Sequence, residues 1–313
     1  MDRRRFLGRA AGSIALASGL STRANAAPSD LTIVDTHQHI WNLSQFKLAW
    51  ITPGDPLAKD FLPSDYARAT EGLNVVKAIY MEVDVVPDQQ VAEADYVLGL
   101  IKGGKTPMVA AVISGRPNSD GFAAYLDRFR NEPSIKGIRQ VLHASTTPAG
   151  YCLDPAFIKG IRELGRRGLS FDLCMRGPEL PDAAKLIAAC PDTRFILDHC
   201  GNEPVRNKDH SAWNRDLEAI AKHGPRVVCK VSGIVASAKG SPWSADDLAP
   251  IVNHVLDTFG PDRVMFGGDW PVCTLAATYR EWLDALNSIV KNRPEADRRK
   301  LFHDNAVRYY GLA

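Results

Sequence analysis

Two histidines separated by one residue follow a short β-branched stretch near the start of the chain. His37 and His39 come after residues 31–35. Side chains alternate between the two faces of a β-strand, so residues i and i+2 point the same way and both imidazoles can reach one metal ion. The alternative is a pair of structural histidines at a strand end. We predict that both are metal ligands.

Two more groups of the same chemistry end later apolar stretches. His199 lies where residues 194–198 give way to Gly201 and a polar loop, and Asp269 follows residues 264–266 and two glycines. A carboxylate there can bind a metal through one oxygen and accept a proton from water through the other. The alternatives are a structural strand-end histidine and a turn-capping aspartate. We predict that His199 and Asp269 complete the site.

Donor groups are expected at the same rim. Arg139 lies in a fourth apolar stretch and His143 follows it, Lys230 lies in a seventh, and Glu82 ends a second. The guanidinium fork matches two oxygens, so Arg139 could clamp a substrate carboxylate or polarise a carbonyl; an internal ion pair with Glu82 or Asp172 is the alternative. Glu82 is a candidate metal ligand or hydroxyl acceptor. These donors suit an anionic or polyhydroxylated substrate.

Aromatic residues occur in or near the loops expected at this rim. Trp41 and Trp270 are predicted to pack against a substrate ring, and Trp50 and Trp243 lie in similar loops. Core or loop packing is the commoner use of tryptophan.

Eight strand-like stretches could position these residues, and segments of helical periodicity separate them. This alternation predicts an α/β fold, a single closed (β/α)8 (TIM) barrel, with an open doubly wound sheet as the alternative. No G-x-G-x-x-G turn follows the first strand. The strands are expected at 31–35, 75–82, 107–113, 135–142, 169–174, 194–198, 227–231 and 264–266; the helices at 89–101, 122–130, 155–167, 182–189, 213–223, 246–259 and 279–290.

The first residues are typical of a secretion signal. Residues 2–7 (DRRRFL) form a twin-arginine pattern, an apolar stretch follows at 10–20, and residues 24–26 (ANA) form a cleavage site. The apolar stretch is too short to span a bilayer. We expect a signal peptide at 1–26, a barrel domain at 27–313, a periplasmic or otherwise exported protein, and the Tat export machinery as a partner.

Charge and cysteine content limit the partners that the protein can have and indicate the state of its cysteines. Of 38 basic and 36 acidic residues, five arginines and one aspartate lie in 1–26, so the mature chain is nearly neutral. That balance gives no electrostatic basis for binding nucleic acid or a membrane surface, and we expect no stable membrane insertion. The six cysteines contain no C-x-x-C pair and are expected to be buried thiols.

The motifs resemble a known family. Asp35–Trp41 (DTHQHIW), Leu197–Gly201 (LDHCG) and Phe266–Val272 (FGGDWPV) are similar to the amidohydrolase-related family of the amidohydrolase superfamily. Within it, the sequence is most similar to the sugar-lactonase branch: fuconolactonases, rhamnonolactonases and pyrone-dicarboxylate lactonases. The resemblance covers essentially the whole mature chain.

The resemblance implies roles for four residues. His37 and His39 match the first-strand histidines, His199 the sixth-strand histidine and Asp269 the water-activating aspartate. Many binuclear members carry a carboxylated lysine late in the fourth strand, whereas Lys136 begins that strand here. One divalent ion, zinc, is therefore expected, and a metal-free site remains open.

The preferred function is hydrolysis of a small lactone, a sugar-acid or related carboxylated lactone, by water that Asp269 and a metal activate. The first alternative is a metal-dependent decarboxylase of an unsaturated or aromatic acid. The second is a non-catalytic periplasmic sugar-acid binding protein. Binding alone does not require His37, His39, His199 and Asp269 together, which argues against the second.

Overall fold

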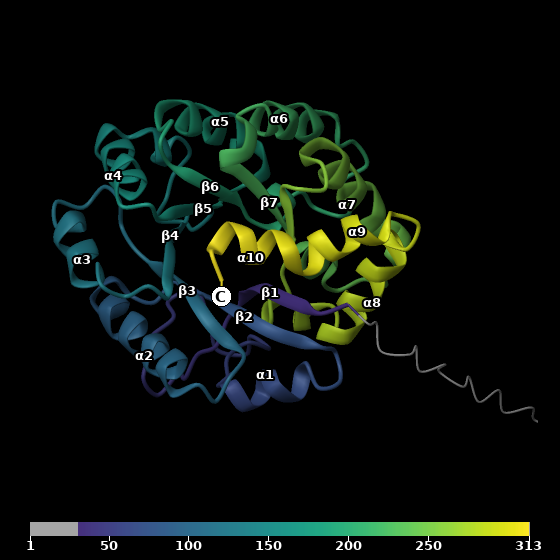
Figure 1. The fold of residues 1–313 in the computed structure, drawn as a ribbon, viewed down its shortest axis with the longest axis horizontal. Coiled ribbons are helices and arrows are strands. Elements are labelled where there is room, and N and C mark those ends of the chain that lie inside the picture. The colour runs from purple at the N-terminus through teal and green to yellow at the C-terminus, as the bar shows by residue number, and fades with distance from the viewer. Residues whose placement is uncertain (1–30, 313) are drawn as a thin grey trace, which may run out of the picture.

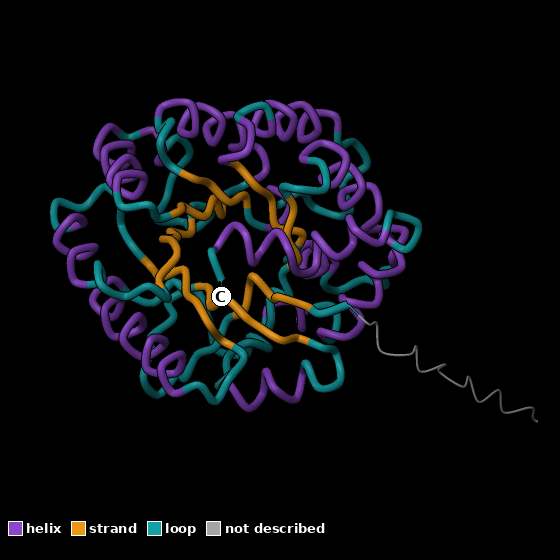
Figure 2. The backbone as a smooth tube through the Cα atoms, in the orientation of Figure 1, coloured by secondary structure: helices purple, strands orange, loops and turns teal. Residues whose placement is uncertain are grey.

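The computed structural model describes residues 31–312, which form a ring of eight parallel strands surrounded by helices (Figure 1, Figure 2). Each strand pairs with the next in sequence order, so the predicted (β/α)8 barrel is confirmed. The strands are β1 (Ile33–Gln38), β2 (Val75–Met81), β3 (Met108–Ser114), β4 (Ile135–Val141), β5 (Ser170–Cys174), β6 (Arg194–Leu197), β7 (Val227–Val231) and β8 (Val264–Phe266).

The seven predicted helices are present with ends shifted by a few residues, and three short helices were not predicted: α1, α9 and α10. Short helices offer too few residues for a periodic pattern to stand out. The helices are α1 (Pro63–Ala69), α2 (Gln90–Gly103), α3 (Phe122–Arg128), α4 (Pro155–Arg166), α5 (Leu180–Ala189), α6 (Ser211–Ala221), α7 (Ala245–Phe259), α8 (Tyr279–Val290), α9 (Glu295–Arg299) and α10 (Asn305–Tyr310).

Side-chain caps set the start of the outer helices. The Asp154 carboxylate accepts hydrogen bonds from the backbone N–H groups of Ala156 and Phe157, and α4 then begins with a proline, whose missing N–H costs nothing there. At α8, Thr278 and Glu281 form a reciprocal capping box. These caps fix the residues at which the rim loops end and the helices begin.

Backbone hydrogen bonds join the first and last strands just beyond β8. The Asp269 N–H donates to the His37 carbonyl at 2.8 Å, and the His39 N–H donates to the Trp270 carbonyl at 2.8 Å. Because all strands run in the same direction, their carboxyl ends share one rim. The closure therefore places Asp269 directly beside the two histidines of the first strand.

The opposite end of the barrel is closed by the C-terminal helix. In Figure 1, α10 lies across the ring of strands. Tyr310, 3% exposed, packs with Val34, Met265 and other inward-facing strand residues, while a larger apolar cluster fills the layer between strands and outer helices. One end of the barrel is thus plugged by side chains, and ligands have access from the other.

A bulge in β1 sets which of its side chains face inward. The register with β2 shifts between Asp35 and Gln38. Asp35 therefore points outward, where its carboxylate accepts hydrogen bonds from the hydroxyls of Tyr66 and Tyr279. His37, two residues later, faces the opposite way, into the barrel. Strict alternation would have put both on one side.

Other sequence predictions can also be compared with this structure. All six cysteines are buried thiols, as predicted. Among residues 31–312, no helix is both long and apolar enough to cross a bilayer. The predicted signal peptide, residues 1–26, lies outside the described residues.

Candidate active site

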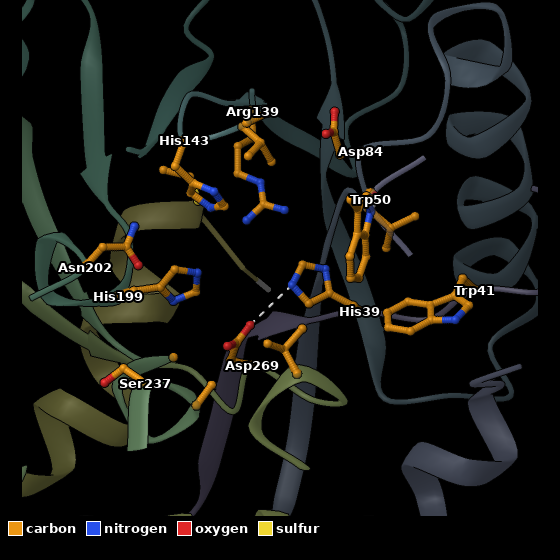
Figure 3. A pocket seen from close by; sticks show the side chains of 17 residues that line it. His39, Trp41, Trp50, Asp84, Arg139, His143, His199, Asn202, Ser237 and Asp269 are labelled. Carbon is orange, nitrogen blue, oxygen red and sulfur yellow. Dashed lines mark hydrogen bonds and ion pairs between the residues drawn. The ribbon is translucent and has the colours of Figure 1, made fainter. Parts of the chain in front are cut away.

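A cavity of about 350 Å³ opens at the carboxyl-terminal rim of the barrel (Figure 3). His39, His199 and Asp269 converge at one side of it, and Arg139 and His143 lie above them in this view. These predicted rim residues thus come together from the ends of four different strands, β1, β4, β6 and β8. The lining residues are His39, Trp41, Trp50, Val83, Asp84, Arg139, Val141, His143, Ala144, Cys174, His199, Asn202, Gly233, Ala236, Ser237, Asp269 and Val272.

His39 and Asp269 face one another across the floor of the cavity. The ring Nδ1 of His39 donates to the Met81 carbonyl at 2.9 Å, so in the neutral ring Nε2 carries a lone pair. That Nε2 lies 3.3 Å from Asp269 Oδ1. Two acceptors at this distance repel each other unless a proton or a cation lies between them. The pair is therefore a suitable place for either.

His37 packs edge-on against His39, with ring centroids 4.9 Å apart, and is fully buried. Its Nε2 is 3.6 Å from Asp269 Oδ1 and 3.3 Å from Arg139 Nη1. Its Nδ1 lies 3.6 Å from Asp198 Oδ1, a little too far for a hydrogen bond. Burial lowers the pKa of His37 well below its usual value, although Asp198 opposes the shift. The ring is thus held neutral between two carboxylates and a guanidinium.

His199 is held by contacts with the segment that follows β7. Its Nδ1 is hydrogen-bonded to Ser232 Oγ at 2.9 Å, and Gly233 (φ +67°) lies so close that an added Cβ would be 2.3 Å from that nitrogen. His199 itself has φ +53°, and Asp269 has φ +51°. Left-handed backbone at such residues costs free energy and clusters at functional sites. Burial lowers the pKa of His199.

A chain of buried charges lies below the cavity. Arg139 Nε donates to Glu82 Oε1 at 2.6 Å, and Arg139 Nη1 to Asp198 Oδ2 at 3.4 Å. Lys230 Nζ lies 2.7 Å from Asp172 Oδ2 and 3.3 Å from Asp198 Oδ1. Removing one member would leave a buried charge without a partner, which is strongly destabilising. The network therefore holds Arg139 and Asp198 firmly around His37.

The network also sets the ionisation of its members. Burial raises the pKa of Asp172 to about 7, although Lys230 opposes the shift. For Asp198, burial acts in the same direction, but Lys230 and His37 outweigh it and hold its pKa well below the usual value. At the rim, burial and the neighbouring His199 lower the pKa of His143 to about 4. Asp198 thus stays a carboxylate and His143 stays neutral near pH 7.

The donor set fits a divalent metal ion. Ligand atoms of His37, His199 and Asp269 lie within 4.8 Å of one another. The His39 lone pair directed at Asp269 adds a fourth donor of the kind zinc prefers. One contact competes with this set, because Arg139 Nη1 occupies the side of His37 that faces Asp269.

Besides the buried His37, three predicted substrate or metal contacts are not among the residues that line the cavity. Glu82 is paired with Arg139, Lys230 is enclosed by carboxylates, and both are fully buried. Trp270 packs edge-on against Phe61 and Tyr66 and is 4% exposed. Glu82, Lys230 or Trp270 could contact the substrate directly only if it broke these contacts within the protein. The internal ion pair weighed as the alternative for Arg139 is present with Glu82.

Several residues of the site were not singled out from the sequence. Asp198 shares a motif with His199, and Asp84 lies two residues after Glu82 at the end of β2. Ser232 directly follows β7. Their position at or just after the carboxyl end of a parallel strand was the available signal. Asn202, Ser237 and Cys174 also line the cavity.

Comparison with known proteins places the chain in a family. Residues 34–312 match the family model described as amidohydrolase, so the chain belongs to this family of hydrolases. An L-fucono-1,5-lactonase of Burkholderia multivorans is 29% identical, over 89% of this chain and 96% of that protein. An L-rhamnono-gamma-lactonase of Scheffersomyces stipitis is 22% identical, over 91% and 100%. A zinc-bound amidohydrolase structure from Burkholderia multivorans has a TM-score of 0.79 and 27% identity, covering 90% of this chain and 100% of that one.

Proposed function

We propose that this chain opens a small lactone ring by hydrolysis, with Asp269 as the general base. The observation that carries the proposal is the position of Asp269 Oδ1, 3.3 Å from His39 Nε2 and 3.6 Å from His37 Nε2 at the floor of the cavity. The lactonases among the relatives supply the class of substrate.

Asp269 accepts a proton from water as the water oxygen attacks the lactone carbonyl. A new C–O bond forms, and the bond from the carbonyl carbon to the ring oxygen then breaks. Asp269 returns the proton to the departing ring oxygen, so the product is a hydroxy acid. The hydrogen bond from His39 Nδ1 to the Met81 carbonyl fixes the orientation of the ring, so that Nε2 continues to face Asp269.

Arg139 supplies a donor for the developing oxyanion. Its Nε and Nη2 donate to the side chain and backbone carbonyl of Glu82, and its Nη1 contacts His37 and Asp198. Held in this way, the guanidinium lines the cavity with little freedom to move. A fixed donor stabilises new negative charge without the cost of reorientation.

A single zinc ion is the metal that we propose, and His37, His39, His199 and Asp269 would hold it. A bound zinc ion polarises a carbonyl and lowers the pKa of water toward neutral. The zinc-bound structural relative supports this part of the proposal.

The test compares wild type with Asp269→Asn and Asp284→Asn. Asp284 is an exposed residue of α8 and makes the same chemical change away from the cavity. In a pH-indicator assay with a panel of sugar lactones, Asp269→Asn should lose about 10²–10⁴-fold in kcat/KM, and Asp284→Asn should match wild type. Full activity in Asp269→Asn would refute the role of the base; metal content by mass spectrometry reports on zinc independently.

A further inference from the structure

We propose that the cavity selects an uncharged, polyhydroxylated lactone over a carboxylated one, and that Asp84 positions this substrate by accepting its hydroxyl hydrogens. The inference rests on the proposed lactone hydrolysis and narrows its substrate class. It follows from the charges around the cavity, which contains two carboxylates, those of Asp84 and Asp269, and one guanidinium, that of Arg139.

The positive charge of the Arg139 guanidinium is already paired with protein carboxylates, so it cannot form a further ion pair with a substrate carboxylate. Arg139 already pairs with Glu82 at 2.6 Å and with Asp198 at 3.4 Å, and the side chain is nearly fully buried. Each of its three nitrogens has a protein partner, so the two-pronged clamp that recognises a carboxylate is in use. Arg139 can still donate one hydrogen bond, which suits a neutral carbonyl.

The nearest other cations are also engaged. Lys230 lies below the wall between Asp172 and Asp198. Arg176 donates to the carbonyls of Leu142, Ala144 and Thr147 and pairs with Glu179. Arg116 pairs with Asp84 at 3.0 Å. Among the residues that line the cavity in the described chain, Arg139 is the sole lysine or arginine. Away from the proposed zinc ion at the cavity floor, a substrate carboxylate would therefore lose its water without gaining an unpaired cation, which is costly.

Asp84 offers the opposite chemistry on the wall across from His199. It lies beside Trp50 at the far side of the cavity in Figure 3. Its Oδ1 accepts from Arg116, its own N–H donates to Glu82 Oε2 at 2.7 Å, and its backbone is held at φ +50°. Within residues 31–312, no hydrogen bond to Oδ2 is present, and the side chain is 23% exposed. This oxygen can accept hydroxyl hydrogens, whereas it repels a carboxylate.

The wall formed by Trp41 and Trp50 is apolar and suits the carbon face of a sugar ring. Trp50 is 40% exposed and is fixed by its Nε1 bond to the Val83 carbonyl. Trp41 meets it edge-on, with ring centroids 5.7 Å apart. A ring placed against these aromatics would have Asp84 on one side and Asp269 on the other. Such a wall adds contact area without adding charge.

The experiment measures binding and turnover with matched ligands. The binding probes are two non-hydrolysable lactams of equal ring size, one bearing only hydroxyls and one with a carboxylate in place of the terminal hydroxymethyl group. The turnover substrates are the corresponding lactones. Wild type, Asp84→Asn and Asp88→Asn are compared by calorimetry and by kcat/KM. Asp88 is an exposed residue four positions further along the same segment and serves as the matched control.

Wild type and Asp88→Asn should bind the hydroxylated lactam at least about tenfold more tightly than the carboxylated one. Asp84→Asn should reduce that preference by about tenfold, because it removes one hydrogen bond to a charged acceptor. Equal or tighter binding of the carboxylated lactam by wild type, or an unchanged preference in Asp84→Asn, would overturn the inference. Turnover that favours carboxylated lactones would overturn it and leave lactone hydrolysis intact. Absence of turnover with the predicted lactam preference would instead reject lactone hydrolysis and support the inferred specificity.

Discussion

The orientation of His199 depends on a close approach that one methyl group would prevent. Gly233 has φ +67°, and a Cβ built on it would lie 2.3 Å from His199 Nδ1 and 2.6 Å from Cγ. The imidazole cannot keep both this position and its hydrogen bond to Ser232 if residue 233 carries a side chain. The identity of residue 233 thus acts on the chemistry through His199.

Gly233→Ala should therefore lower lactone kcat/KM by at least about tenfold, because a misplaced catalytic group costs this much or more. Gly240→Ala is the matched control, since Gly240 has φ +81° and open space around its Cβ position. Both variants carry the same backbone strain, about 1 kcal/mol. Thermal melts and activity assays on the pair separate the two effects, and equal activity losses would show that strain alone is responsible.

The four main site residues could be predicted from the sequence, whereas the charge network could not. His37, His39, His199 and Asp269 each lie within three residues of the carboxyl end of a strand, and parallel strands bring their ends to one rim. Pairing between Arg139 and Glu82 depends on how side chains from different strands meet inside the barrel, and the sequence of a single strand does not reveal this. For this reason, polar residues that were expected to contact the substrate, such as Glu82 and Lys230, form ion pairs within the protein instead.

Among the elements, the segment from the end of β2 into α2 contains three carboxylates that are buried or partly buried, Glu82, Asp84 and Glu93. Glu82 and Asp84 follow the strand, and Glu93 of α2 accepts hydrogen bonds through Oε1 from the Val83 N–H and the Tyr80 hydroxyl. Burial and the charge of Glu82 raise the pKa of Glu93 to about 8. The folded protein therefore keeps a proton on Glu93 at pH values where the unfolded chain has released it.

This difference gives a pH dependence of stability. Between about pH 4.5, the unfolded value, and about pH 8, the folded state binds more protons at Glu93, so its contribution to stability falls as the pH rises. Glu93→Gln keeps the Oε1 acceptor and removes the titration. The variant should gain stability relative to wild type by about 1 kcal/mol or more from pH 5 to pH 8.

Urea unfolding at several pH values measures this difference, with Glu71→Gln, an exposed site, as the control. A wild-type minus Glu93→Gln difference that stays constant with pH would contradict the raised pKa. Glu71→Gln should follow wild type throughout, since its side chain lies on the surface.

The β1 bulge illustrates what hydrophobic patterning misses. The strand and its two histidines could be predicted, but strict alternation would place Asp35 inside with His37. The extra residue in β1 turns Asp35 outward to the hydroxyls of Tyr66 and Tyr279, which come from α1 and α8. The partners are far away in sequence, so only the assembled barrel shows why this carboxylate is buried.

For the whole molecule, the sequence predicted the architecture because eight strand signals alternate with helical ones. The plug formed by α10 was not predicted, since its six residues give too short a pattern. Tyr310 nonetheless closes the end of the barrel opposite the cavity. Ligand entry is thereby restricted to the rim where His39, His199 and Asp269 lie.

The N-terminal residues lead to a prediction about where the folded protein is delivered. We propose export through the twin-arginine route, which carries folded proteins; a barrel with six buried, unpaired cysteines can fold in a reducing compartment before transport. Receptors read the arginine pair itself, so replacing Arg3 and Arg4 by lysine keeps the charge and removes the signal. The variant should remain in the cytoplasm.

Cell fractionation with the lactone assay, and N-terminal sequencing of the exported product, measure this outcome. Arg9→Lys with Arg23→Lys makes the same chemical change outside the pattern and should be exported and cleaved after Ala26 like wild type. Export of the Arg3→Lys, Arg4→Lys variant at the wild-type level would show that the pair is not read as a signal. Because activity is assayed in both fractions, retention of a folded enzyme is distinguished from failure to fold, and a fully active cytoplasmic pool is the result that we expect.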